Sequence, residues 1–196
     1  MKKVIIVGAG GHGKVIADIV KLSGDEVVGY LDDRETKALP GFNILGTTAH
    51  IGATDCWYFA AIGNSANREK IMRHKVKWYI AIHPAAVIAK DVEIGEGSCV
   101  MANAVINPGS TLARGVIINT AATVDHDCMI DNFVHIAPGV HISGTVTVGE
   151  KCWVGVGSTI SNNVNICGNC TIGAGTVVIK DIDKTGTYVG VPARKI

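Results

Sequence analysis

The chain has 196 residues, in which 18 Lys and Arg face 17 Asp and Glu, giving a formal net charge of +1 at pH 7. This length accommodates one large domain or two small ones. A charge so close to zero excludes the strongly basic surface of a typical nucleic-acid-binding protein and a general attraction to acidic membranes. We therefore expect neither nucleic acid nor a membrane as a partner.

The six cysteines could indicate disulfides or zinc, but Cys167 and Cys170 form the only C-x-x-C pair. The apolar run 4–7 that follows Met1-Lys2-Lys3 ends at Gly8, which is too short for the core of a signal peptide. With no export signal, the thiols are expected to remain reduced in a cytoplasmic protein.

The first 84 residues predict a small open α/β domain. Residues 3–7 are typical of a buried strand, and a helix is expected over 11–22 with Val15, Ile16, Ile19 and Val20 as its buried stripe. A second strand is predicted over 26–31, a third over 57–62 and a fourth over 76–82. A charged helix over 65–74 should begin at Asn64 or Ser65, and His83-Pro84 marks the domain boundary.

A glycine-rich turn joins the first strand to the first helix. Its letters match G-x-G-x-x-G, and an acidic pair stands about twenty residues further on; the candidate nucleotide-binding residues are Gly8, Gly10, Gly11, His12, Gly13, Asp32 and Asp33. Such a turn offers backbone N–H groups and a helix N-terminus to a diphosphate, with one acid near a ribose hydroxyl. The alternative is a tight turn without a ligand. NAD is disfavoured because no second mononucleotide half follows.

Residues 85–196 predict a different architecture. An aliphatic residue stands at every sixth position: Ile88, Ile94, Val100, Ile106, Leu112, Ile118, Val124, Ile130, Ile136, Ile142, Val148, Val154, Ile160, Ile166, Ile172 and Val178. Four residues after each of these stands a second, mostly small side chain, among them Cys128, Cys152 and Cys170, which are therefore expected in the core. The period fits neither one strand nor one helix; it predicts a solenoid of five coils with three short strands each.

Glycines directly follow four of the aliphatic residues, at Gly95, Gly149, Gly155 and Gly173. We expect them to serve turns that need a positive φ.

One repeat places acids on both sides of a histidine. In Val124-Asp125-His126-Asp127-Cys128, the first and last residues should point inward, so that Asp125, His126 and Asp127 point outward. A carboxylate on one ring nitrogen raises the basicity of the other, so His126 is a candidate general base. The alternatives are a solvated surface histidine, or a zinc site formed with His135 and His141.

Five motifs along nearly the whole chain carry a resemblance: G-A-G-G-H-G at 8–13, L-D-D at 31–33, A-I-G-N at 61–64, N-T-x-x-x-V-D-H-D-C at 119–128 and V-G-V-P-A-R at 189–194. Together the chain resembles the bacterial nucleotide-amino-sugar N-acetyltransferases and, more distantly, the sialic acid O-acetyltransferases. The resemblance implies an α/β Rossmann-like domain (1–84) followed by an all-β left-handed parallel β-helix (85–196), acetyl-CoA as co-substrate, no metal, and a homotrimer with active sites between subunits.

The resemblance also implies roles for individual residues. His126 corresponds to the catalytic base, with Asp127 favoured over Asp125 as its partner, and Asn119 to an active-site asparagine. His12, the acidic pair and the Gly63-Asn64 turn correspond to the uridine nucleotide site. Acetyl-CoA is expected along His135, Gly144, Gly173, Gly190, Pro192 and Arg194.

The reaction implied is direct attack of the 4-amine of a UDP-linked 4-amino-4,6-dideoxy sugar on acetyl-CoA, with His126 accepting the proton. An acyl-enzyme is not expected because Cys128 should point inward. Three alternatives remain open: O-acetylation of sialic acid or another surface sugar, a zinc-dependent carbonic anhydrase, and an assembly module without catalysis. The identity of the sugar is not determined by the sequence.

Overall fold

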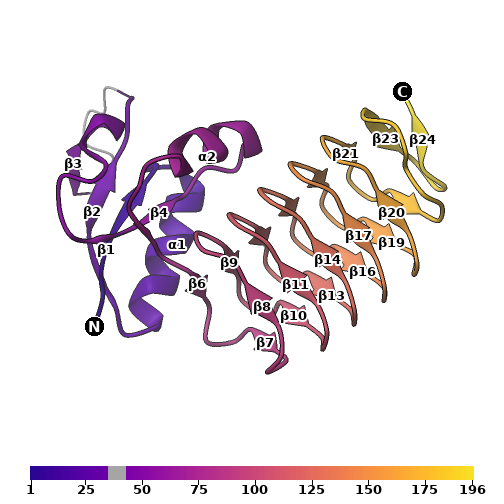
Figure 1. Cartoon of the computed structure of the whole chain (residues 1–196), viewed down its shortest axis with the longest axis horizontal. Helices are drawn as coiled ribbons and strands as arrows, with labels where there is room; N and C mark the ends of the chain where they lie inside the picture. The colour runs from indigo at the N-terminus through magenta and orange to yellow at the C-terminus, as the bar shows by residue number, and fades with distance from the viewer. Residues whose placement is uncertain (35–42) are drawn as a thin grey trace.

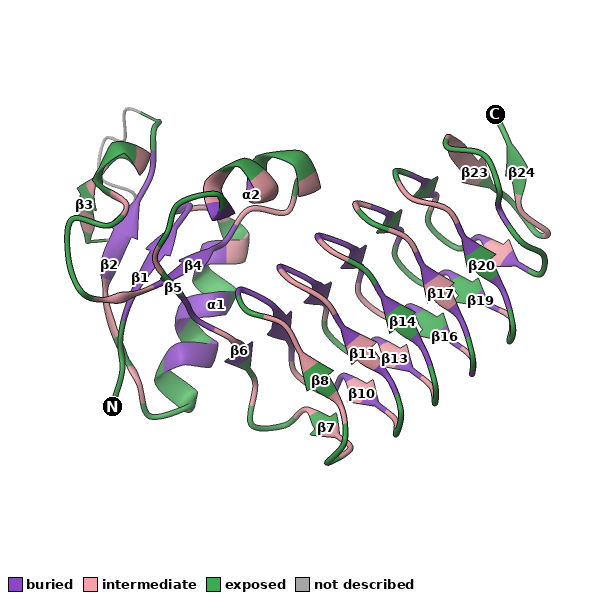
Figure 2. Cartoon of the chain, in the orientation of Figure 1, coloured by how far each residue is buried: buried purple, intermediate pink, exposed green. Residues whose placement is uncertain are grey.

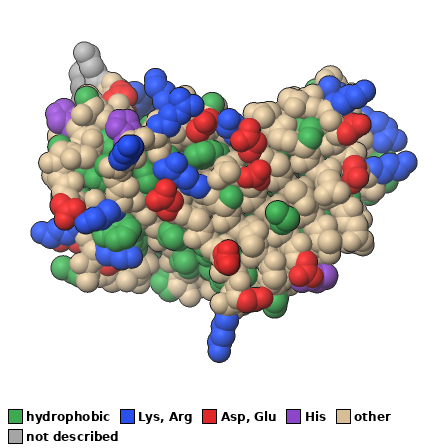
Figure 3. Space-filling view, viewed as in Figure 1, with side chains coloured by type: hydrophobic (Ala, Val, Ile, Leu, Met, Phe, Trp, Pro, Cys, Tyr) green, Lys and Arg blue, Asp and Glu red, His purple; other side chains and the backbone are tan. Residues whose placement is uncertain are grey.

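The chain folds into two units (Figure 1): an N-terminal α/β domain, followed by a long solenoid that extends to the C-terminus. The computed structural model describes residues 1–34 and 43–196. Within these residues no helix combines the length and apolar character needed to cross a membrane. On the face seen in Figure 3, basic and acidic side chains are interspersed.

The N-terminal domain is built on a parallel sheet with the strand order β3-β2-β1-β4-β5. Its strands are β1 (Lys3–Val7), β2 (Glu26–Leu31), β3 (Ile44–Gly46), β4 (Trp57–Ala60) and β5 (Lys77–Trp78). Its helices are α1 (Gly11–Leu22), α2 (Ser65–Met72) and a 3-10 turn at Thr48–His50. The first two predicted strands and the first helix are confirmed residue for residue, whereas β3 and the 3-10 turn were not predicted.

The buried face of α1 differs from the predicted stripe. Val15 is 41% exposed, whereas Gly13 and Ala17 are buried together with Ile16, Ile19 and Val20. The helix contacts β1 and β2 of its own domain and also β6 of the solenoid. A helix packed on two sides buries small residues that the pattern of large aliphatic residues does not reveal.

The predicted strand over 76–82 is two strands in two different sheets. Lys77–Trp78 pairs with β4, whereas β6 (Ala81–Ile82) pairs with β9 (Cys99–Val100) as the first rung of the solenoid. The chain therefore passes from one unit to the next within three residues, just before the boundary at 84 that we proposed from His83-Pro84.

The solenoid consists of three parallel sheets. The first solenoid sheet contains β6, β9, β12 (Ile117–Ile118), β15 (His135–Ile136), β18 (Trp153–Val154) and β21 (Thr171–Ile172), followed by β23 (Thr187–Val189) and the antiparallel β24 (Arg194–Lys195). The second contains β7 (Val87–Ile88), β10 (Val105–Ile106), β13 (Thr123–Val124), β16 (His141–Ile142), β19 (Thr159–Ile160) and β22 (Val177–Val178). The third contains β8 (Glu93–Ile94), β11 (Thr111–Leu112), β14 (Met129–Ile130), β17 (Thr147–Val148) and β20 (Asn165–Ile166).

Stacking of equivalent residues creates the solenoid core. Ile118, for example, pairs with Val100 of the coil before and Ile136 of the coil after. From Val100 to Val178, the aliphatic residue at every sixth position is buried. Cys128, Cys152 and Cys170 are buried as well, which confirms the inward positions predicted from the repeat. Figure 2 shows buried, intermediate and exposed segments alternating around each coil of the solenoid. The fold is an α/β Rossmann-like domain followed by a left-handed parallel β-helix.

The prediction that the four glycines after the aliphatic residues adopt a positive φ was wrong. From Ile94 to Ile172, positive φ occurs three residues after each of these aliphatic residues, at corners that include Gly97, Ala121, Asp127 and Phe133, and not at Gly95, Gly149, Gly155 or Gly173. Those four glycines are needed for space: a Cβ on Gly149 would lie 2.5 Å from the backbone nitrogen of Gly168 in the next coil.

This distinction leads to a prediction about stability. Gly149→Ala should lower the free energy of unfolding by about 3 kcal/mol because a backbone must move to admit the methyl group. Gly157→Ala should cost only about 1 kcal/mol, since its φ is +65° but no atom lies within 4 Å of the new Cβ. Urea unfolding of the two variants measures the difference, and equal losses would contradict the assignment.

The N-terminal domain packs on the outer face of the first solenoid sheet at its first strands, β6, β9 and β12. Cys99 and Ile117 point outward from this sheet yet are fully buried, in one cluster with Ala9, Ala17 and Tyr79. The glycine turn that follows β1 is thereby placed beside the β-helix.

Candidate active site

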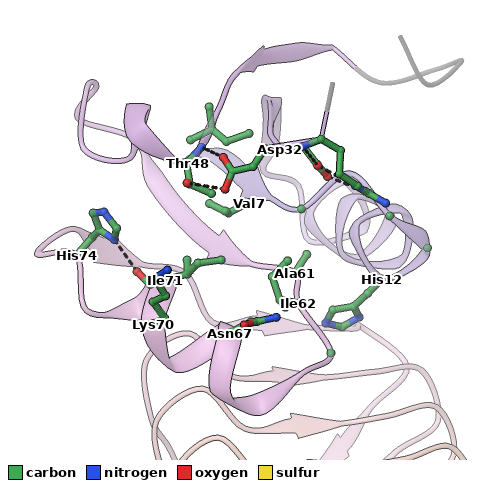
Figure 4. A pocket seen from close by; sticks show the side chains of 17 residues that line it. Val7, His12, Asp32, Thr48, Ala61, Ile62, Asn67, Lys70, Ile71 and His74 are labelled. Carbon is green, nitrogen blue, oxygen red and sulfur yellow. Dashed lines mark hydrogen bonds and ion pairs between the residues drawn. The ribbon is translucent and has the colours of Figure 1, made fainter. Parts of the chain in front are cut away.

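A cavity of about 610 Å³ opens over the glycine turn. It lies where β1, β2 and β4 end, which is the edge at which open α/β sheets bind ligands. Figure 4 shows His12 at one side and Lys70 with His74 at the other. The lining residues are Val7, Gly8, Gly10, Gly11, His12, Leu31, Asp32, Asp33, Arg34, Thr48, Ala61, Ile62, Gly63, Asn67, Lys70, Ile71 and His74.

The acidic pair supports the walls of this cavity. Asp32 accepts a hydrogen bond from the Ala9 N–H at 2.8 Å and pairs with the Arg34 guanidinium at 2.7 Å. The hydrogen bonds from Arg34 hold the pKa of Asp32 well below its usual range. Asp33 accepts from the N–H and the hydroxyl of Thr48. Both carboxylates thus have protein partners, and Asp32 ties the second strand to the glycine turn.

Two of the predicted nucleotide-binding residues do not line the cavity. Gly13 is buried behind the turn, where a Cβ would collide with the carbonyl oxygen of Gly8. Asn64 is the N-cap of α2, and its side chain accepts a hydrogen bond from the Asn67 N–H at 3.0 Å. These two residues shape the elements around the cavity.

One wall of the cavity was missed from the sequence. Asn67, Lys70, Ile71 and His74 reach it from α2 and the turn after that helix. A short charged helix with no apolar stripe gives no signal of which polar face meets a ligand.

His126 and Asp127 form a pair on the corner between the second and third solenoid sheets. Asp127 Oδ2 lies 2.9 Å from His126 Nδ1, and the two side chains are 57% and 65% exposed. This hydrogen bond raises the pKa of His126 above its ordinary value. Because an ionised carboxylate only accepts, Nδ1 carries the proton and Nε2 is the basic nitrogen of the neutral ring.

Two further groups position this pair. Asp125 accepts from the His126 backbone N–H at 2.8 Å and from the Asn107 amide at 2.7 Å, and the Asn107 hydrogen bond lowers the pKa of Asp125. A Cβ on Gly144 would lie 2.5 Å from both Cε1 and Nε2 of His126, so the imidazole occupies space that a side chain would fill. Asn107 was not predicted from the sequence.

A second histidine cluster lies where the two units meet. The His135 ring stacks on Trp153 at a centroid distance of 5.0 Å, and its Nε2 lies 3.2 Å from the Asn119 amide nitrogen. Burial lowers the pKa of His12 and of His135 to about 4 in each case, with the Arg68 cation as a further cause. Both rings are therefore neutral at physiological pH. Asn119 and His12 lie near His135. All three are distant from His126 of the same chain.

The three histidines weighed for zinc stand on separate parts of the solenoid. His126 occupies a corner, His135 the first sheet, and His141 the second sheet, where its Nδ1 lies 2.9 Å from the Thr123 hydroxyl. Across 1–34 and 43–196, no three His, Cys, Asp or Glu side chains come together in a way that could hold a metal ion.

The residues near the C-terminus that were predicted to contact acetyl-CoA lie together at the last coil. A pocket of about 280 Å³ is lined there by Pro192, Arg194 and Tyr188, among others. Gly173 lets the tail strand β23 approach, because a Cβ on this glycine would lie 2.7 Å from Val189 Cγ1. Gly190 has a φ of +98° at the turn of this tail.

The contact between His126 and Asp127 leads to a prediction about pH dependence. Asp127→Asn replaces the carboxylate whose hydrogen bond, together with its charge, raises the pKa of His126, so the acid limb of the kcat/KM profile should move to lower pH, with kcat reduced. Asp125→Asn is the comparison: Asp125 is bonded to the backbone of His126 and raises the pKa of its ring only through its charge, so a smaller shift in the same direction is expected. Profiles of thiol release between pH 5 and 8 measure both, and a larger shift in Asp125→Asn would contradict the pairing.

Comparison with known proteins gives consistent matches. Residues 3–75 match the model of the PglD N-terminal domain. The acetyltransferase domain of PglB from Neisseria gonorrhoeae, solved with acetyl coenzyme A, is 39% identical with a TM-score of 0.95, over 100% of this chain and 99% of that one. PerB from Caulobacter crescentus, solved with CoA and GDP-perosamine, is 34% identical with a TM-score of 0.93, over 100% and 98% of the two chains.

A curated relative matches over a shorter stretch. The UDP-N-acetylbacillosamine N-acetyltransferase of Bacillus subtilis is 34% identical over 113 residues. That alignment covers 52% of this chain and 52% of the relative, so the match spans about half the length of the curated protein.

Proposed function

Since the chain belongs to the nucleotide-amino-sugar N-acetyltransferases that contain a left-handed β-helix, we propose that it transfers the acetyl group of acetyl-CoA to a nucleotide-linked amino sugar. The acceptor we propose is the 4-amine of a UDP-linked 4-amino-4,6-dideoxy sugar. The observation that carries this proposal is the His126–Asp127 pair, whose Nε2 is the basic ring nitrogen on an exposed corner.

His126 acts in this proposal as the general base. The neutral amine attacks the thioester carbonyl, and Nε2 accepts the proton that the nitrogen loses as the tetrahedral intermediate forms. Asp127 stabilises the imidazolium that results, and collapse of the intermediate expels the CoA thiolate. A positioned base of this kind contributes about 10²–10⁴-fold to the rate.

The uridine diphosphate is proposed to bind in the cavity over the glycine turn. The N–H groups at the start of α1 suit the diphosphate, and the neutral His12 stands at the end of the cavity nearest the β-helix. The volume of about 610 Å³ suits a nucleotide, since small-molecule sites commonly measure roughly 300–1,000 Å³.

We propose a homotrimer with shared active sites, and the placement of these parts supports it. The N-terminal domain packs on the first strands of the first solenoid sheet, whereas His126 stands on the opposite corner between the other two sheets. One chain thus presents its base and its nucleotide cavity on different sides. We propose that His126 and Gly144 of one subunit meet His135, Asn119 and the nucleotide cavity of a neighbour, with acetyl-CoA extending to the tail pocket.

The reaction is proposed to take place in the cytoplasm. All six cysteines are free thiols, which fits a reducing compartment.

Thiol release from acetyl-CoA tests the proposal directly. The acceptors are the gluco and galacto epimers of a UDP-linked 4-amino-4,6-dideoxy-N-acetyl sugar, with GDP-perosamine and free sialic acid beside them. Turnover on either UDP sugar supports the proposal and gives the epimer preference. Turnover only on GDP-perosamine would change the nucleotide, turnover only on sialic acid would replace N- by O-acetylation, and no release on any acceptor would overturn the activity.

A further inference from the structure

Arg68 on α2 is a fully buried cation that the proposed chemistry does not use. Its five N–H donors meet five backbone carbonyls. Nε donates to Gly115 at 2.8 Å, Nη1 to Ile62 at 2.8 Å and Gly63 at 2.9 Å, and Nη2 to Phe133 at 2.6 Å and Val134 at 3.4 Å. Burial lowers the pKa of Arg68 to about 10, so it stays protonated at neutral pH.

The five carbonyls belong to both structural units. Ile62 and Gly63 form the loop after β4 and line the nucleotide cavity. Gly115, Phe133 and Val134 lie in two successive coils of the β-helix, at the corner between its third and first sheets. One planar guanidinium therefore fixes the cavity loop against two coils at the same time.

The same helix contributes to the cavity from its other side. Asn67, Lys70 and Ile71 line the cavity, while Glu69 pairs with Lys151 of the β-helix at 3.1 Å. The Cε1 atom of His135 lies 4.0 Å from the position of a Gly63 Cβ. A shift of the loop at 62–63 would therefore move the cavity wall relative to His135.

Stability alone does not explain a charge in this place. Removing a cation from water is costly, and a well-packed apolar residue of similar volume is commonly as stable or more stable. A guanidinium differs from an apolar side chain in directing five hydrogen bonds from one rigid plane. Its specific contribution is the relative position of the groups that it binds.

We propose that Arg68 is a positioning residue, which holds the nucleotide cavity in register with His135 and the acetyl-CoA side of the active site. The inference rests on the proposed function. It assigns to Arg68 a role in binding the nucleotide sugar, although the guanidinium touches neither substrate.

The test compares Arg68→Met and Arg68→Lys with Arg73→Met, whose exposed side chain sits at the end of the same helix and pairs with Glu69. Steady-state kinetics on the full chain give kcat and the KM of each substrate, and thermal melting reports the fold. Arg68→Met should raise the KM of the nucleotide sugar about 10-fold or more, with the KM of acetyl-CoA within about twofold of wild type. Arg68→Lys should fall between, because an ammonium keeps the charge but has three donors. Arg73→Met should match wild type.

Other results of these measurements would contradict the positioning role of Arg68 or move its test to nucleotide binding. Unchanged values of both KMs, or a lower Tm with the ratio of the two KMs preserved, would overturn the inference and leave Arg68 a structural role only. Insolubility of both Arg68 variants would do the same. If wild type shows no turnover on any acceptor, the proposed function fails, and calorimetry with UDP replaces kinetics. A weaker Kd for UDP in Arg68→Met than in Arg73→Met would then still support the inference, and equal Kd values would overturn it.

Discussion

Replacing His126 with alanine is expected to lower kcat by about 10²–10⁴-fold while the protein remains folded. The loss follows from the removal of the base that takes the proton of the attacking amine. The fold should be unaffected because the side chain is 57% exposed and bonds only to Asp127 in the described part of the chain. Thiol release from acetyl-CoA at saturating acceptor measures the effect.

His141 provides a matched control for this variant. It is an outward histidine on the neighbouring strand β16, bonded to the Thr123 hydroxyl and to no acid in the structure described above. His141→Ala should keep kcat within about twofold of wild type, since it removes no charge-assisted pair. Near wild-type turnover of His126→Ala, or an equal loss in both variants, would contradict the assignment of the base.

Replacing Ile130 with aspartate is expected to unfold the β-helix. Ile130 is 1% exposed and stacks between Leu112 and Val148 of the adjacent coils. A carboxylate there has no cation to pair with, and an unpaired buried charge costs about 3–5 kcal/mol in addition to the apolar contacts that are lost. That loss approaches the whole stability of a typical protein, roughly 5–15 kcal/mol.

The neighbouring residue on the same strand supplies the control. Met129 points outward and is 60% exposed, so Met129→Asp should leave the thermal unfolding transition within a few degrees of wild type. Circular dichroism and size-exclusion chromatography distinguish the two variants. A well-folded Ile130→Asp protein with an unchanged Tm would contradict the stacked core.

The β-helix was the part of the fold most open to prediction from sequence. From β7 to β22 its strands are two residues long, and the same environment recurs every six residues, so the side-chain type at each position reports directly whether it points inward. The core assignment from Val100 to Val178 followed from that local repetition. The ends did not. Ile82 of β6 continues the six-residue spacing one strand before the predicted start, whereas β23 pairs Tyr188 with Ile172, which is not a multiple of six residues away.

The glycines show how a correct residue can be given a wrong reason. Gly95, Gly149, Gly155 and Gly173 were recognised as special positions, but their φ angles are not in the left-handed region. What they require is room beside an adjacent coil, which depends on residues that stand 15 to 19 positions further along the chain. The residues next to each glycine in the sequence do not reveal this contact.

The sequence by itself determined the two-part architecture, the outward direction of His126 between two acids and the glycine turn after the first strand, because each depends on residues within a few positions of one another. Only the tertiary structure decided that Asp127 bonds to the imidazole and Asp125 does not, that α2 forms a wall of the cavity over the glycine turn, and that Arg68 is buried between the two units. Arg68 lies 65 residues from Phe133 in the chain, and a contact of that range arises only when the two units pack together. An arginine on a charged helix and an arginine at the centre of a domain junction have the same local sequence; their environments differ, and the packing of distant segments creates those environments.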